Sequence, residues 1–297
     1  MAARVIDGRV LANKIDEETL SMLREVAIHG ARPSLAVITV GSDAASYSYS
    51  RQKEKVASRL NIGYRNIVKD ENSEEDEIIA TVDELAADSQ VDGVLVHTPL
   101  PPRLDERRIL DRIPHMKDVD CASTYNMGRL YSGRPLHPPA TAQAVVEILV
   151  RSGFSPAGKH VVVLGRSLVV GKPLANLLIM KSQGGDATVT VCHSRTVDVH
   201  AFTRRADILV SAIGRPAYVT KDMVNPGTVV VDVGINSIPD PSTKSGYRIV
   251  GDVDFEGVSE VASAITPVPG GVGPVTTSVL MKNVARAHLA RTDLLHN

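Results

Sequence analysis

The 297-residue sequence contains no tryptophan, and only 3% of its residues are aromatic. Single-stranded nucleic acids are bound largely by stacking their bases on aromatic side chains, so this composition argues against such a partner. Positive charge is not in excess either, because 33 Lys and Arg residues are balanced by 34 Asp and Glu residues. We therefore exclude nucleic acid as a partner, while a small anionic ligand in a local pocket stays compatible with the composition.

Cysteine is scarce, with only Cys121 and Cys192, and no CxxC pair occurs. This count excludes a disulfide framework and a zinc ribbon, and it fits a reducing compartment. The nine histidines show no HxH or HExxH spacing, so we predict no metal site. The sequence has no run of 18 apolar residues and no apolar signal segment at its start. We expect a soluble, cytoplasmic protein that does not bind a membrane.

The first half of the chain alternates between extended and helical patterns. Apolar runs typical of buried strands occur at 34–40 and 92–96. Helical periodicity is found at 9–27, at 43–60 and at about 73–88, where Ser73 opens a capping-box-like sequence. Residues rich in Pro, Gly and Asp follow and place a domain boundary near residue 140. This pattern predicts an α/β domain over residues 1–140.

A second alternation begins at residue 141, and its strands are continuous apolar runs. They are expected at 160–165, 187–192, 207–214, 227–234 and within 262–268. Such runs predict a Rossmann-like parallel sheet covered on both faces, over residues 141–271. A last helix at 278–292, within the segment 272–297, is expected to return and pack on the first domain.

The segment from Gly165 to Pro173 (GRSLVVGKP) joins a predicted strand to a predicted helix. A glycine turn there directs backbone N–H groups and the helix dipole at an anion. The segment is not a P-loop of a kinase or ATPase, because it has one residue too many between its glycines and Pro173 replaces the metal-binding hydroxyl. An ordinary strand-to-helix turn is the alternative.

The next strand should reach the adenosine ribose of a dinucleotide. NAD sites place an acid there, whereas this strand is followed by His193, Ser194 and Arg195. Imidazole, hydroxyl and guanidinium groups suit a 2′-phosphate, so the sequence favours NADP. The alternative is a solvated polar turn.

Three further features carry candidate chemistry. Tyr49 and Lys53 are spaced i,i+4 and share a helix face, although most such pairs are only solvated. Asp118 and Asp120 in KDVD are able to accept hydrogen bonds from a ring edge, or to form a simple Asx-turn. The tract 266–274 (TPVPGGVGP) combines rigid prolines with glycines that permit close approach to a ligand. We expect this tract to line a cleft between the domains, with a plain hinge as the alternative.

Together these segments resemble the bifunctional methylenetetrahydrofolate dehydrogenase/cyclohydrolase (FolD) family. The motifs run in order from VGS at residue 40, through Tyr49 and Lys53, to DGVLV, PLP and KDVD, and then to GRSLVVGKP, CHSRT, VVDVGIN, GDVDF and TPVPGGVGP. The resemblance implies that 5,10-methylenetetrahydrofolate is oxidised with NADP+ to the methenyl compound. Hydrolysis to 10-formyltetrahydrofolate follows, as part of one-carbon metabolism. The resemblance also implies tetrahydrofolate derivatives as substrates, NADP as cofactor and a homodimer.

The resemblance also assigns residues to roles. Lys53 matches the catalytic lysine, Tyr49 the tyrosine that orients the pterin, and Asp120 the acid that binds the pterin edge. The dinucleotide contacts that it implies are Gly165, Arg166, Ser167, Gly171, His193, Ser194, Arg195, Ile235 and Thr276. Pro269 and Gly273 match the floor of the folate site.

Departures from the family's usual motifs gather at the substrate residues. His97 stands where a glutamine partners the lysine in the usual VQLPLP, so His97 joins the predicted catalytic residues. Where the family usually has KDVDGFH, this sequence has KDVDCAS, beginning at Lys117. Where the family usually has PCTPxG, this sequence has PATAQA, beginning at Pro139. Val275 replaces the methionine that usually follows GVGP.

Other classes of protein remain as alternatives. A short-chain dehydrogenase also uses a Tyr-xxx-Lys pair, but its glycine loop precedes that pair, whereas here the loop follows it. A shikimate- or amino-acid-type dehydrogenase shares the two-domain plan but does not need TPVPGGVGP. The third alternative is a folate- or nucleotide-binding paralogue with altered or lost cyclohydrolase activity. It is suggested by the departures from the family's usual motifs at the substrate residues.

Overall fold

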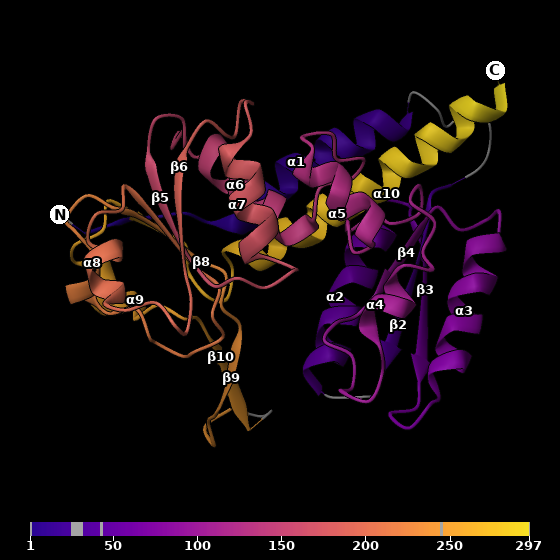
Figure 1. Cartoon of the computed structure of the whole chain (residues 1–297), viewed down its shortest axis with the longest axis horizontal. Helices are drawn as coiled ribbons and strands as arrows, with labels where there is room; N and C mark the ends of the chain where they lie inside the picture. Colours follow the sequence, from indigo (N-terminus) through magenta and orange to yellow (C-terminus); the bar gives the residue numbers. More distant parts are fainter. Residues whose placement is uncertain (1, 25–31, 42–43, 244–245, 297) are drawn as a thin grey trace. The chain divides into compact units, whose positions relative to one another are not determined.

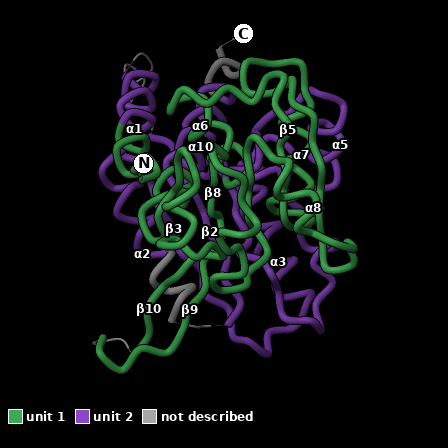
Figure 2. The backbone as a smooth tube through the Cα atoms, turned by 90° about the vertical axis from the view of Figure 1, so that its left-hand side faces the viewer, with its two compact units in different colours: residues 1–13, 141–276 green, residues 14–140, 277–297 purple. Residues whose placement is uncertain are grey.

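The computed structural model describes residues 2–24, 32–41, 44–243 and 246–296, without the side chains of residues 44–49 and 292–296. The chain divides into two compact units. Unit 1 comprises residues 1–13 and 141–276, and unit 2 comprises residues 14–140 and 277–297 (Figure 2). Each unit thus contains one end of the chain.

Unit 1 is built on a six-stranded sheet in the order β1-β11-β8-β7-β5-β6, with every pair of neighbours parallel. Its strands are β1 (Arg4–Val5), β5 (His160–Leu164), β6 (Thr188–Cys192), β7 (Ile208–Ser211), β8 (Val229–Asp232) and β11 (Ala264–Ile265). All residues of β7 and β8 are buried, so helices and loops cover both faces of the central sheet. The predicted parallel sheet of the second half is confirmed, with its strands somewhat shorter than expected.

The connections of unit 1 are mostly helical (Figure 1). They are α6 (Ala140–Arg151), α7 (Gly171–Ile179), α8 (Val199–Thr203), the 3-10 turn Lys221–Met223 and α9 (Phe255–Ser259). An antiparallel hairpin of β9 (Asn236–Pro239) and β10 (Tyr247–Val250) extends from the end of β8. The sequence patterns did not predict this hairpin.

The first residues of the chain lie in unit 1 and not with the α/β elements that follow them. Strand β1 pairs with β11 in register Arg4 to Ala264, and Ile6 N donates to Ile265 O at 2.8 Å. Because β1 has only two residues, no periodicity in the sequence announces it.

Unit 2 has a three-stranded parallel sheet in the order β3-β2-β4. The strands are β2 (Ser34–Val40), β3 (Gly63–Lys69) and β4 (Gly93–Val96). The helices are α1 (Gly8–Arg24), which begins in unit 1, α2 (Ala44–Arg59), α3 (Glu75–Ala87), α4 (Glu106–Leu110) and α5 (Thr124–Tyr131). The core joins β2 and β4 to α3 and α4 through Ile38, Val96, Ile78, Val82 and Ile109.

Two sequence interpretations need correction in unit 2. Strand β3 was not expected, because GYRNIVK at the sheet edge alternates polar and apolar residues and is only partly buried. The capping box at Ser73 is wrong as well. The N-cap of α3 is Glu74, and its side chain makes no capping hydrogen bond.

The C-terminal helix α10 (Val272–His296) is longer than predicted, and its residues from 277 onward belong to unit 2. The carboxylate of Asp92 at the start of β4 holds it there, accepting hydrogen bonds from His288 Nδ1 at 3.1 Å and Arg291 Nε at 2.8 Å. Asn283 adds two hydrogen bonds, to the carbonyls of Val119 and Pro138. The predicted return of this helix to the first α/β domain is confirmed. No helix in the described part of the chain is long and apolar enough to cross a bilayer.

Candidate active site

The glycine loop after β5 is closed so tightly that its two glycines admit no side chain. Gly165 has φ +117°, and a Cβ there would lie 2.3 Å from Ala212 O. A Cβ on Gly171 would lie 2.1 Å from Gly165 O. The loop leads directly into α7, whose first turn contains Pro173. This is the strand, glycine turn and helix that the sequence predicts for an anion site.

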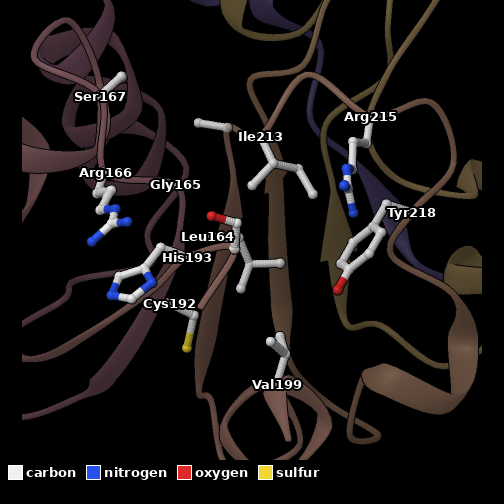
Figure 3. Close-up of a pocket in the computed structure, with 12 residues that line it drawn as sticks. Leu164, Gly165, Arg166, Ser167, Cys192, His193, Val199, Ile213, Arg215 and Tyr218 are labelled. Atoms are coloured by element: carbon white, nitrogen blue, oxygen red, sulfur yellow. The ribbon is translucent and has the colours of Figure 1, made fainter. Parts of the chain in front are cut away.

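A cavity of about 310 Å³ opens beside this loop at the carboxyl ends of β5, β6 and β7. Its lining residues are Leu164, Gly165, Arg166, Ser167, Cys192, His193, Ser194, Val199, Ala212, Ile213, Arg215 and Tyr218. In Figure 3, Arg166 and His193 lie on one side of the cavity, while Arg215 and Tyr218 lie on the opposite side. The cavity therefore offers apolar walls with cationic groups at two edges, which suits the adenosine half of a phosphorylated dinucleotide.

The residues that follow β6 are arranged by their own hydrogen bonds. His193 Nδ1 accepts a hydrogen bond from Arg195 N at 3.2 Å, and His193 N donates to Thr196 Oγ1 at 2.9 Å. His193 and Ser194 line the cavity, as expected for cofactor contacts. Arg195 is exposed and is not among the lining residues, whereas Arg166 is.

Sequence reasoning missed the wall formed by Ile213, Arg215 and Tyr218. The Arg215 guanidinium lies over the Tyr218 ring, 5.7 Å from its centroid. A signal was present, because these residues follow β7, and the carboxyl ends of neighbouring parallel strands meet at one edge of the sheet.

The other residues expected near the ligands in unit 1 follow β8 and β11. Ile235 is 44% exposed just beyond β8. Pro269 precedes α10, and Gly273 and Thr276 lie in its first turns, where Thr276 Oγ1 donates to Val272 O at 3.2 Å. None of these four residues lines the cavity described above.

The glycines of TPVPGGVGP do not all serve one purpose. A Cβ on Gly8 would lie 1.8 Å from Gly271 O, and Gly8 N donates to Gly270 O at 2.9 Å. The absence of a side chain on Gly8 thus allows the tract to pack on the start of α1. A Cβ on Gly273, by contrast, would meet no atom within 4 Å outside its own neighbourhood in the chain.

In unit 2 the structure brings Lys53 of α2 against His97, which directly follows β4. Lys53 Nζ lies 2.8 Å from His97 Nε2, and His97 Nδ1 lies 3.3 Å from Thr39 Oγ1 on β2. An ammonium group only donates, so the charged lysine places the imidazole proton on Nδ1, facing Thr39. Thr39 was not predicted. Its role depends on the pairing of β2 with β4, which no local sequence pattern predicts.

Removal from water lowers the pKa of Lys53 to about 8, and the negative charge of Asp120 partly opposes this shift. A lysine near pH 7 in this state is neutral in about one molecule in ten, against fewer than one in a thousand for a free lysine. The Lys53 amine is therefore able to accept a proton at physiological pH.

The two acids of KDVD differ in their hydrogen bonds. Asp118 is fully buried and accepts hydrogen bonds from Ala122 N, Ser123 N, Ser123 Oγ and Asn126 Nδ2. It therefore builds the loop. Asp120 Oδ1 accepts a hydrogen bond from Ala140 N at 2.7 Å, and no described residue is hydrogen-bonded to its second oxygen. Desolvation raises the pKa of Asp120 to about 6, with a further contribution from the charge of Asp118.

Tyr49 lies in α2 one turn before Lys53, and its side chain is outside the described residues. Among the described residues no group of three or more His, Cys, Asp or Glu side chains is arranged to hold a metal ion.

Comparison with known proteins decides the family. Residues 6–120 match the tetrahydrofolate dehydrogenase/cyclohydrolase catalytic domain, and residues 139–292 match the NAD(P)-binding domain of the same family. The chain belongs to the tetrahydrofolate dehydrogenase/cyclohydrolase family.

Individual members of this family are similar along almost the whole chain. The bifunctional protein FolD of Salinibacter ruber is 46% identical over 285 residues, covering 96% of this chain and 95% of that protein. The FolD of Haloquadratum walsbyi is 43% identical over 290 residues, covering 98% and 92%. Among solved structures, the Trypanosoma brucei methylenetetrahydrofolate dehydrogenase-cyclohydrolase, crystallised with NADP and an inhibitor, has a TM-score of 0.93 at 38% identity. The match covers 98% of this chain and 99% of that one.

One departure from the usual motifs of the tetrahydrofolate dehydrogenase/cyclohydrolase family has a visible backbone consequence. Cys121 occupies the position of the usual glycine in KDVDGFH, and its φ is +55°. That left-handed conformation suits glycine and costs about 1 kcal/mol for a residue with a Cβ. The Cys121 side chain is buried, and burial raises the pKa of its thiol to about 12. The cysteine therefore acts as a small packing residue and not as a nucleophile.

Proposed function

We propose that this protein oxidises 5,10-methylenetetrahydrofolate to 5,10-methenyltetrahydrofolate with NADP+ and then hydrolyses the product to 10-formyltetrahydrofolate. The observation that carries the proposal is the partly buried Lys53, hydrogen-bonded to His97 and in the field of Asp120. This arrangement supplies an amine base beside a carboxylate within the catalytic domain of the family.

The dinucleotide fits unit 1 on structural grounds. Gly165 and Gly171 form a cradle that any Cβ would fill, and the adjoining cavity has a guanidinium group on each side. Bound NADP+ supplies the acceptor for the hydride. The residues proposed to hold it are Gly165, Arg166, Ser167, Gly171, His193, Ser194, Arg195, Ile235 and Thr276.

We assign the preference for NADP chiefly to Arg166, together with His193 and Ser194. Arg166 lines the cavity, and no acidic residue stands at the end of β6 to take a ribose 2′-hydroxyl. A guanidinium group binds a 2′-phosphate with two parallel hydrogen bonds.

For the hydrolysis, neutral Lys53 accepts a proton from the water that attacks the methenyl carbon, and the resulting ammonium returns a proton to N5 as the bond between that carbon and N5 breaks. His97 Nε2 takes up the hydrogen bond of the resulting ammonium, while His97 Nδ1–H donates to Thr39. The open oxygen of Asp120 accepts hydrogen bonds from the amino-pyrimidine edge of the pterin, with Tyr49, Pro269 and Gly273 as the further proposed substrate contacts.

The test replaces Lys53 with methionine, which keeps the length and apolar stem of the side chain. Lys53→Met abolishes hydrolysis of methenyltetrahydrofolate and leaves NADP+ affinity unchanged, because none of the α2 residues with described side chains lines the dinucleotide cavity. The matched control is Lys55→Met, an exposed lysine on the same helix, which leaves hydrolysis unchanged. Wild-type hydrolysis by Lys53→Met would remove this lysine from the mechanism.

We also propose that the protein is a homodimer of the cytoplasm. The family resemblance supports the dimer, and the two buried free cysteines are compatible with a reducing compartment. Light scattering coupled to size-exclusion chromatography gives twice the chain mass of 31.8 kDa if the dimer is correct, and the mass of one chain if it is not. Cell fractionation tests the location.

A further inference from the structure

Two carboxylates lie buried in unit 1 at the edge of the sheet where the dinucleotide cavity opens. Asp232 is the last residue of β8 and is 3% exposed, and Asp252 follows β10 and is 0% exposed. A buried carboxylate is costly unless hydrogen bonds satisfy it. Neither residue lines the cavity, and neither has a part in the chemistry described above.

Asp252 accepts hydrogen bonds from the backbone of one short loop. Its Oδ2 accepts hydrogen bonds from Ile213 N at 2.7 Å and Gly214 N at 3.2 Å, and its Oδ1 accepts one from Arg215 N at 2.9 Å. Three consecutive N–H groups thus converge on a single carboxylate. Ser211 Oγ at 3.3 Å and Asn236 Nδ2 at 2.9 Å complete its partners.

The loop that Asp252 holds is one wall of the cavity. Ile213 and Arg215 both line it, and Arg215 lies over the ring of Tyr218 (Figure 3). The backbone hydrogen bonds therefore fix Ile213 and Arg215, and Arg215 lies across the cavity from Arg166 and His193. The loop follows directly after β7, which ends at Ser211.

Asp232 in turn fixes the backbone that carries Asp252. Its Oδ1 accepts a hydrogen bond from Asp252 N at 3.0 Å, and its Oδ2 accepts one from Val253 N at 2.9 Å. Glycines make room for both carboxylates. A Cβ on Gly251 would lie 1.8 Å from Asp232 Oδ2, and a Cβ on Gly234 would lie 2.3 Å from Asp252 Oδ1.

We propose that Asp252 is a positioning residue for the dinucleotide, which holds the Ile213–Gly214–Arg215 wall in the shape that receives the adenosine half of NADP. The inference rests on the proposed function only in taking NADP as the occupant of this cavity. Without the carboxylate the three N–H groups lose their acceptor, and the wall relaxes away from the ligand.

The experiment measures binding directly, by calorimetry of the full-length protein with NADP+ and with adenosine 2′,5′-bisphosphate. Asp252→Asn keeps the shape of the side chain but turns an NH2 group toward backbone N–H donors. Because these donors then lack an acceptor, the wall relaxes, and both ligands bind about tenfold more weakly. Hydrolysis of methenyltetrahydrofolate and the melting temperature serve as readouts of the fold: hydrolysis stays close to wild type, and the melting temperature falls by only a few degrees.

Asp254→Asn is the matched control, because Asp254 belongs to the same GDVDF segment but caps α9 through Gly257 N. This variant binds both ligands as the wild type does. If Asp252→Asn does not fold, Asn236→Ala decides the matter. It removes one of the partners of Asp252 and weakens binding about two- to threefold.

Two results would overturn the proposal. One is wild-type affinity for both ligands in a folded Asp252→Asn, or in Asn236→Ala where Asp252→Asn does not fold. The other is a loss of hydrolysis and thermal stability as large as the loss of binding, which would make Asp252 a general structural residue. A wild-type protein that binds NADP+ but does not oxidise methylenetetrahydrofolate would refute the proposed function and leave this inference standing.

Discussion

Lys53 and His97 form a pair of nitrogen bases 2.8 Å apart, which carry at most one shared positive charge while their hydrogen bond lasts. If both were protonated, two positive charges would repel each other, and His97 Nε2 would no longer accept the hydrogen bond of the lysine. The pair is faced by Thr39 on β2 and by the acid Asp120, with Asp118 behind it in the same loop. This arrangement makes the hydrolytic step sensitive to pH.

The first prediction is that methenyl hydrolysis falls more steeply than methylene oxidation at acidic pH, because a doubly protonated His97 no longer accepts the hydrogen bond of Lys53. Loss of the neutral Lys53 amine already lowers the rate as the pH falls through about 8. Protonation of His97 adds a second descending limb. His97→Gln removes that second limb and leaves the first. Profiles of both reactions between pH 5.5 and 8.5 are the measurement, and identical hydrolysis profiles for wild type and His97→Gln would exclude this role.

A second prediction separates Arg166 from Arg195, the two arginines proposed to contact the dinucleotide. Arg166→Ala lowers the preference for NADP+ over NAD+ by about tenfold or more, because one charge-assisted hydrogen bond is worth about 1.5–3 kcal/mol. Arg195→Ala has a smaller effect, since Arg195 does not line the cavity. The ratio of kcat/KM for the two dinucleotides measures this preference, and a larger loss in Arg195→Ala would reverse the assignment.

Sequence motifs name individual candidate residues but not the residues that they contact. Lys53, His97 and Asp120 come from the motif order, and the structure brings Lys53 and His97 together. Thr39 was beyond reach, because its role depends on the pairing of β2 with β4 and not on any local pattern. The separate roles of Asp118 and Asp120 also depend on the fold, because the sequence pattern alone does not distinguish the two acids.

Among the elements, α10 is held in place partly by one buried carboxylate, that of Asp92. Asp92 is 2% exposed and joins Ser34 N, His288 and Arg291, which brings the start of β2, the start of β4 and the C-terminal helix together. Removal of one partner from such a cluster leaves buried groups without compensation.

The third prediction is that Asp92→Ala lowers the free energy of unfolding by about 3 kcal/mol or more. Asp83→Ala is the control, because Asp83 pairs with Arg112 on the protein surface, where ion pairs contribute little. Urea denaturation of the two variants gives the comparison. A loss in Asp92→Ala no greater than in Asp83→Ala would show that the cluster does not secure the helix.

Apolar patterning predicted the buried elements and missed the exposed ones. All strands of the second domain that are continuous apolar runs appear in the structure. Strand β3 and the hairpin β9–β10 escaped because edge and surface strands do not bury enough side chains to leave such a run.

At the scale of the whole molecule, both ends of the chain cross to the other unit. Residues 1–13 complete the sheet of unit 1, and residues 277–297 complete unit 2. The helix at the C-terminus was predictable from its periodicity, whereas β1 owes its place to pairing with β11. Each unit therefore includes a segment of chain from beyond the domain boundary near residue 140.

In the proposed function, one chain carries out both an oxidation and a hydrolysis. The most direct test incubates the protein with 5,10-methylenetetrahydrofolate and NADP+, and follows NADPH and 10-formyltetrahydrofolate in the same sample. We predict that NADPH forms only when the folate is present, and that 10-formyltetrahydrofolate then accumulates faster than methenyltetrahydrofolate hydrolyses in buffer alone. Absence of folate-dependent NADPH, or hydrolysis no faster than in buffer, would contradict this account.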